Sequence, residues 1–323
     1  MSDSVQNLIA EPEDKGTRID KYLSQELEDV SRSRIQKLLD DGDITVDDKC
    51  VKSNYKLNGT EHITITIPEL IVPQILPENI PLNIIYEDDD VILIDKPKGM
   101  VVHPAAGHYT GTVVNALMYH CRDNLSGING VMRPGIVHRI DMNTTGVIVA
   151  CKNDKAHNDI AAQLAVHSIT RKYYCIVHNR FKEEEGTVDA PIGRNPKDRK
   201  MMAVDRKNGK RAVTHYRVLE NFDKYSFIEC QLETGRTHQI RAHMASIGHP
   251  LVGDTKYGKG KKAPDSIKYQ ALYSYKLKFN FETDAGILNY LNGKEFEVND
   301  VWFAKNRKIN PVSYTHLRAH ETR

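Results

Sequence analysis

The sequence predicts an α+β protein in two domains, with a largely antiparallel sheet in the second. Alternating apolar residues mark many strands, and the helical segments between them are isolated instead of following every strand, which favours α+β over parallel α/β folds. Four prolines interrupt one stretch of the chain: Pro68, Pro73, Pro77 and Pro81. Proline is excluded from long helices and central strands. We therefore place domains at 15–68 and 82–305, with a linker at 69–81.

Composition narrows the class of protein further. The 323 residues exceed one average domain, and 45 basic residues nearly balance 43 acidic ones, so net charge predicts no partner. The five cysteines are scattered without a Cys-x-x-Cys pair, which argues against structural zinc and against a disulfide framework. We see no signal segment and no apolar run of membrane-spanning length. We expect a cytoplasmic monomer that binds no membrane and no metal.

Two helices and a short β-ribbon are expected in the first domain. Residues 1–15 are polar, and we expect no regular structure there. Helical apolar spacing follows, and Ser31 is a candidate N-cap for a second helix that Gly42 ends. Alternating apolar residues at 44–46 and 60–67 then predict two strands.

The second helix of this domain is basic. Arg32, Arg34 and Lys37 lie on its neighbouring faces, and the ordinary interpretation of such charges is a solvated surface. However, the pattern Ser-Arg-x-x-Ile-Gln-Lys-Leu-Leu-x-x-Gly-x-Ile-x-Val resembles the S4 RNA-binding domain. The resemblance implies that this helix lies along an RNA backbone and that these three residues contact it.

Strands outnumber helices in the second domain. We expect strands at 84–86, 91–94, 147–149, 173–178, 213–220 and 225–232, and helices at 111–121, 154–167 and 237–247. The last 13 residues, 311–323, show no periodicity, and we interpret them as either a native tail or a cloning or assembly scar. We place the C-terminal tail at 306–323 and assign no function to 311–323.

A polar loop leads into the strand at 147–149, and loops held by a rigid scaffold commonly carry reactive groups. An aspartate in such a loop usually caps a turn, and this is the ordinary interpretation of Asp141. Yet the whole string His138-Arg-Ile-Asp-x-x-Thr-Thr-Gly resembles the signature of the RluA/RluD family of pseudouridine synthases. By that resemblance, Asp141 is the catalytic nucleophile. Thr145 departs slightly from the family, where Ser is more usual, but the hydroxyl is kept.

Three further strings resemble the same family, in the same order. They are Lys96-Pro-Lys-Gly-Met-Val-Val-His-Pro-x-x-Gly, Arg171-Lys-Tyr, and Leu232-Glu-Thr-Gly-Arg-Thr-His-Gln-Ile-Arg continuing to Asp254. The resemblance implies that Tyr173 lies against the target base and that Arg236 is the ionic partner of the catalytic aspartate. The alternative for Tyr173 is a core aromatic residue in a strand.

The family resemblance implies the isomerisation of uridine to pseudouridine in structured RNA, with large-subunit ribosomal RNA or its assembly intermediates as the expected partner. A uridine inside a helix must be extruded, and Arg139 is a candidate to fill the vacated place. Its alternatives are a phosphate contact or a salt bridge. No redox step occurs, so we expect no cofactor, and nucleotide-binding motifs are missing from the sequence. We interpret His138, His238 and His243 as structural.

Two other functions match parts of the sequence less well. A non-catalytic RNA-binding factor with the same fold is disfavoured because Asp141, Tyr173 and Arg236 are all retained. A kinase-like enzyme is suggested by His138-Arg-x-Asp141, but kinases need His-Arg-Asp without the inserted residue, together with a Gly-rich loop and Asp-Phe-Gly. We set that interpretation aside.

Overall fold

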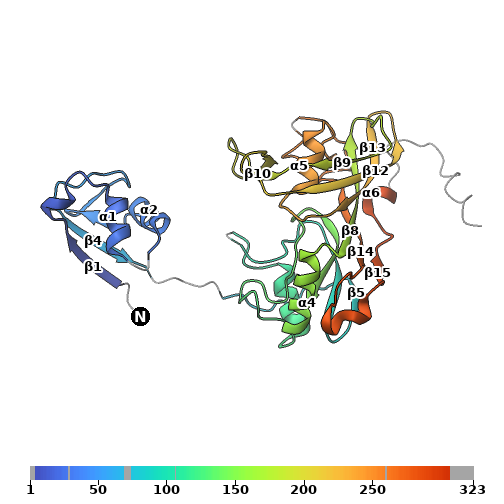
Figure 1. Ribbon diagram of the computed structural model, residues 1–323, viewed down its shortest axis with the longest axis horizontal. Helices are drawn as coiled ribbons and strands as arrows, with labels where there is room; N and C mark the ends of the chain where they lie inside the picture. Colours follow the sequence, from blue (N-terminus) through green and yellow to red (C-terminus); the bar gives the residue numbers. More distant parts are fainter. Residues whose placement is uncertain (1–3, 28–29, 69–73, 106, 259, 306–323) are drawn as a thin grey trace, which may run out of the picture. The chain divides into compact units, whose positions relative to one another are not determined.

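The structure, a computed structural model, describes residues 4–27, 30–68, 74–105, 107–258 and 260–305. The chain divides into two compact units, Met1–Gln74 and Ile75–Arg323 (Figure 1). The tail at 306–323 and residues 69–73 of the expected linker lie outside the described residues. Among the residues that the structure describes, no helix is long and apolar enough to span a bilayer.

The first unit is a four-stranded antiparallel sheet, in the order β1-β4-β2-β3, with two α-helices. Its elements are β1 (Ser4–Ile9), η1 (Pro12–Asp14), α1 (Ile19–Glu26), α2 (Arg32–Asp41), β2 (Ile44–Val46), β3 (Lys49–Cys50) and β4 (His62–Ile67). Helix α2 begins as the sequence predicts, because the Ser31 side chain accepts a hydrogen bond from the backbone N–H of Arg34. It ends at Gly42, whose φ is 83°.

The expectation that residues 1–15 lack regular structure was wrong. Ser4–Ile9 forms β1 and pairs antiparallel with β4, with Ser4 opposite Ile67. The apolar residues of β1 give little signal, since Val5 and Ile9 are 57% and 59% exposed. The open edge of β4 accepts this strand through backbone hydrogen bonds, which do not depend on side-chain type.

The second unit is built on a nine-stranded, mixed and largely antiparallel sheet, which confirms the predicted fold class. The strand order is β5-β6-β7-β14-β8-β13-β12-β9, with β15 added beside β14, and β7 and β14 are parallel. The strands are β5 (Ile84–Glu87), β6 (Val91–Lys96), β7 (Thr145–Cys151), β8 (Ile169–His178), β9 (Glu185–Asp189), β12 (Val213–Asn221), β13 (Tyr225–Leu232), β14 (Leu272–Phe279) and β15 (Glu295–Glu297), with a separate hairpin of β10 (Ile192–Arg194) and β11 (Met202–Val204).

Helices cover the two faces of this sheet. They are α3 (Val113–Cys121), α4 (Asp154–Ala165), α5 (Gln239–Ser246), η2 (Gly286–Leu291) and α6 (Trp302–Lys305). Every residue of β7 is buried. Its side chains alternate: Ile148 packs in the same core cluster as α3 and α5, whereas Val147 and Val149 pack in the cluster that contains α4 and η2. Burial on both faces holds the start of β7, and the polar loop before it, in a fixed place.

Candidate active site

A cavity of about 580 Å³ lies where the loop before β7 meets the end of β13 and the start of α5. Its volume falls within the range of roughly 300–1,000 Å³ that is usual for ligand sites. Its lining includes all four residues that the sequence predicted for the second domain: Arg139, Asp141, Tyr173 and Arg236. The fold therefore brings three separate motifs to one place.

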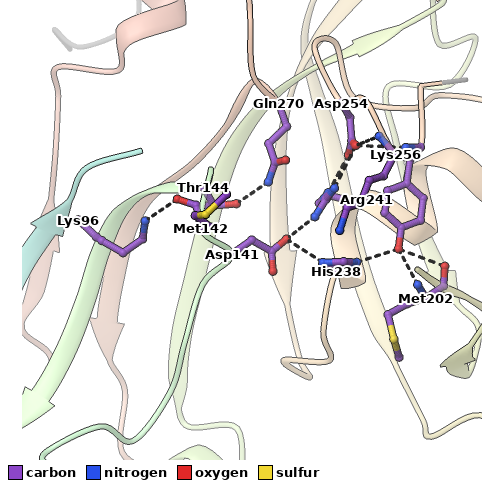
Figure 2. A network of polar contacts seen from close by, with 11 residues as sticks. Lys96, Asp141, Met142, Thr144, Met202, His238, Arg241, Asp254, Lys256 and Gln270 are labelled. Carbon is purple, nitrogen blue, oxygen red and sulfur yellow. Dashed lines mark hydrogen bonds and ion pairs between the residues drawn. The ribbon is translucent and has the colours of Figure 1, made fainter. Parts of the chain in front are cut away.

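Asp141 is held by an ion pair with Arg241 (Figure 2). The guanidinium Nη1 donates to Asp141 Oδ2 at 2.8 Å, and its other nitrogens donate to Asp254, Nε to Oδ2 at 2.7 Å and Nη2 to Oδ1 at 3.0 Å. The Arg241 side chain is only 6% exposed, and that of Asp254 is fully buried. One buried cation thus fixes the Asp141 carboxylate and is itself oriented by a second carboxylate.

This arrangement corrects the expected pairing of Asp141 with Arg236. The Arg236 side chain is exposed, and its Nε donates to the backbone carbonyl of Arg211 at 3.0 Å. Both arginines belong to one sequence motif, but α5 begins at Gln239, between them. Arg241 therefore lies in the first turn of the helix and faces inward, whereas Arg236 lies in the loop before it. Because Arg236 still lines the cavity, a role toward RNA stays a prediction.

A second group near Asp141 was not anticipated. His238 Nε2 lies 3.9 Å from Asp141 Oδ2, and its Nδ1 is 3.0 Å from the hydroxyl of Tyr257. Burial lowers the pKa of His238 to about 4, so the ring is neutral at pH 7 and gives Asp141 no counter-charge. Two other histidines are structural as expected: His138 accepts from a backbone N–H of β7, and His243 contacts β12.

Lys96 is hydrogen-bonded to the loop that carries Asp141. The side chain is fully buried, and its Nζ donates to the backbone carbonyls of Pro97 at 2.7 Å, Met100 at 2.9 Å and Met142 at 3.0 Å. Met142 follows Asp141 directly, so the ammonium group ties the loop to the end of β6 (Figure 2). Burial lowers the pKa of Lys96 to about 7, although the charges of Asp141 and Asp95 oppose this shift.

The lowered pKa of Lys96 predicts a pH dependence of stability. Between pH 7 and about 10.5 the unfolded chain keeps the Lys96 proton while the folded chain releases it, so the contribution of Lys96 to the free energy of unfolding rises with pH. The free energy of unfolding would be measured with urea for wild type and Lys96→Met. The value for wild type minus the value for the variant should increase by about 1.4 kcal/mol per pH unit in this range. Lys98→Met, at an exposed position of the following loop, is the control for the loss of one lysine. A constant difference for Lys96→Met would contradict the lowered pKa.

Tyr173 lies on β8 and is 6% exposed. It is opposite Cys230 of β13 and Ser274 of β14. Burial raises the pKa of its phenol above the ordinary value, so the hydroxyl keeps its proton at neutral pH. The residue therefore offers the cavity an apolar ring and a protonated hydroxyl.

One predicted RNA contact of the first unit, Arg32, is bound to a buried carboxylate. Asp20 is fully buried and accepts hydrogen bonds from Arg18, Arg32 and Gln36. The side chains of Arg18 and Arg32 are 45% and 51% exposed, so Asp20 holds both guanidinium groups at the surface. Lys37 is exposed and Arg34 half-buried on the same helix. Arg32, Arg34 and Lys37 are thus accessible to a ligand.

Comparison with known proteins identifies the family. The sequence profile of RNA pseudouridylate synthases matches residues 90–246, and that of the S4 domain matches residues 17–63. A Bacillus subtilis protein, the uncharacterized RNA pseudouridine synthase YlyB, is 51% identical over 274 residues, which cover 85% of this chain and 89% of that protein. Ribosomal large subunit pseudouridine synthase D of Zymomonas mobilis is 45% identical over 273 residues, covering 82% and 86%.

A solved structure shares the fold. Human RNA pseudouridylate synthase domain containing 1 superposes with a TM-score of 0.55 at 23% identity, covering 68% of this chain and 84% of that one. The sequence motifs, the two matched profiles and the extended identity to named synthases all agree. The chain therefore belongs to the RluA/RluD family of RNA pseudouridine synthases, which are isomerases, and it carries an S4 domain before the synthase domain.

Proposed function

We propose that the protein converts specific uridines of large-subunit ribosomal RNA to pseudouridine, with Asp141 as the nucleophile or base at the sugar. The observation that carries the proposal is the Asp141 carboxylate, held in a cavity by a buried guanidinium. The substrate is supported by the relatives named ribosomal large subunit pseudouridine synthase D, from Zymomonas mobilis and Nitrosomonas europaea among others.

The reaction needs no group besides those of the protein. The glycosidic bond from uracil N1 to the sugar breaks, the base turns, and C5 joins the same carbon; the proton lost from C5 is balanced by the one gained at N1. A carboxylate suits this task, as it does at the anomeric carbon in glycosidases. The Arg241 guanidinium supplies the positive charge beside the Asp141 carboxylate.

The uridine must leave its stack to reach Asp141. Tyr173 lines the cavity and supplies a flat face for the uracil. Because its phenol stays protonated, it serves as a hydrogen-bond donor more readily than as a base for the C5 proton. Arg139 is exposed, and its Nη1 lies 3.3 Å from His103 Nε2. In this proposal, Arg139 leaves the contact with His103 and enters the RNA stack.

The proposal is tested by mapping pseudouridines in large-subunit ribosomal RNA. RNA from cells with the gene, without it, and with only an Asp141→Asn copy would be compared. We expect specific positions to lose pseudouridine without the gene and to stay unmodified with the variant. Unchanged modification in all three strains would reject this substrate. Modification retained with the variant would favour a role of the carboxylate outside the chemistry.

The S4 domain is expected to supply binding and not chemistry. Removing Met1–Gln74 deletes Arg32, Arg34 and Lys37 but leaves the second compact unit complete. The truncated protein should bind structured RNA more weakly, and the dependence of log affinity on log salt should fall by roughly 0.9 for each phosphate that the S4 domain neutralises. The single-turnover rate at saturating RNA should stay within about twofold of wild type, since the groups that surround Asp141 are retained.

Affinity and rate at several salt concentrations measure this division of labour, with circular dichroism to establish folding. If the rate collapses in a folded truncation, the S4 domain takes part in building the active complex. If the salt dependence is unchanged, its basic helix is only a solvated face.

A further inference from the structure

Arg171 is a buried cation without an anion. The residue is 7% exposed, on β8 two positions before Tyr173, and therefore on the same face of the strand. Its Nη2 donates to the backbone carbonyl of Glu233 at 3.3 Å, and its Nε is buried without a partner. Among the described residues, no carboxylate forms an ion pair with it. This is unusual, since buried arginines are normally paired.

The neighbours of Arg171 do not balance its charge. The Glu233 carboxylate is already bound, to Arg211 at 2.6 Å and to His215 at 2.8 Å. His138 is neutral, because burial and then the charge of Arg171 lower its pKa to about 3. Arg241, by contrast, has two carboxylates around the same cavity. Of the two buried arginines in the described part of the chain, Arg171 is thus the one without a carboxylate partner.

Gly235 makes room for this guanidinium. A Cβ atom at position 235 would lie 2.8 Å from Arg171 Nη1, closer than side chains tolerate. Arg171 and Gly235 both line the cavity that holds Asp141 and Tyr173. The chain therefore holds a planar, positively charged group against bare backbone at the wall of the substrate cavity.

We propose that Arg171 and Gly235 form a binding site for an internucleotide phosphate of RNA, next to the uridine that enters the cavity. This site rests on the proposed function. Uracil and ribose are neutral, so the phosphodiester is the one group of RNA that can balance a buried cation. A guanidinium binds its oxygens with two parallel N–H donors. Arg139 and Arg236 also line the cavity, but they are exposed, and water screens their charges.

The test is a double-mutant cycle between the protein and single phosphates. The probe is the heptanucleotide CCCUCCC, in which one phosphate at a time is replaced by a neutral methylphosphonate. Affinity is measured by fluorescence anisotropy in the Asp141→Asn background, so turnover does not enter. One replacement beside the uridine should weaken binding by about 10- to 100-fold, as expected for a hydrogen bond to a charged group. With Arg171→Met added, the same replacement should weaken binding by less than about twofold.

Two further variants make the result specific. Lys172→Met is the matched control, because Lys172 is the next residue of β8, lies on its opposite face, and pairs with Glu229 at 3.1 Å. Each methylphosphonate should weaken binding equally with and without this change. Arg171→Lys keeps the charge and should recover part of the coupling. Since Arg171→Met removes an unpaired buried charge, it should fold, as judged by its melting temperature.

If a methylphosphonate replacement weakens binding equally with and without Arg171→Met, the phosphate site is overturned and Arg171 is a structural residue. Pseudouridine formation by the wild-type protein on large-subunit RNA is scored separately. Failure of that assay rejects the proposed substrate, whereas failure of the binding cycle rejects only the phosphate site.

Discussion

The Asp141→Asn variant is expected to lose pseudouridine formation by about 10⁴-fold or more, while its RNA affinity stays within a few-fold of wild type. The change keeps the shape of the side chain and an oxygen that can accept the hydrogen bond from Arg241, now 2.8 Å from Asp141 Oδ2. It removes the negative charge that the proposed chemistry needs. The basic groups that we expect to contact phosphates are untouched, so binding should survive.

Single-turnover assays on a ribosomal RNA fragment that the wild-type protein modifies would measure this loss, with affinity measured on the same RNA. Asp265→Asn is the control, because Asp265 is exposed and does not line the cavity. It should behave as wild type. Substantial pseudouridine formation by Asp141→Asn would remove Asp141 from the chemistry and revive the interpretation of a residue that caps a turn.

The position of Asp141 could be predicted because its determinants are local in sequence. A polar loop followed by an apolar run identifies a strand whose residues are all buried, and β7 is such a strand. The same applies to α2, which has a serine cap and a glycine stop. The edge strand β1 was missed because its stability comes from backbone pairing with β4. The paired residues are far apart in the sequence: the nearest pair, Ile9 and His62, is separated by 53 positions.

The charge pairing in the cavity could not be predicted from the sequence. Arg236 and Arg241 are separated by only a few residues of one motif, and the exact start of α5 decides which of them faces inward. The second carboxylate that binds Arg241 belongs to Asp254, and no local sequence pattern predicts that contact. Lys96 and Arg171 belong to motifs that the sequence shows, but their burial is a property of the folded sheet.

Replacing Arg241 should be far more damaging than replacing Arg236. Arg241→Met strands Asp141, which is 18% exposed, and Asp254, which is fully buried. Breaking a buried pair by removing one partner commonly costs about 3–5 kcal/mol, and we expect a loss of stability of that size with almost no remaining activity. Arg236 is exposed, so Arg236→Met should change stability by about 0.5 kcal/mol or less and keep most of the activity.

Urea unfolding and single-turnover rates of the two variants would be compared under the same conditions. Arg241→Lys guards against a variant that does not fold: it keeps the charge but loses the fork between Asp141 and Asp254, so we expect a folded protein with a reduced rate. The opposite result is informative. If Arg236→Met loses activity as completely as Arg241→Met while remaining stable, Arg236 must move onto Asp141 or the substrate when RNA binds, because in the free protein its Nε is bound to the carbonyl of Arg211.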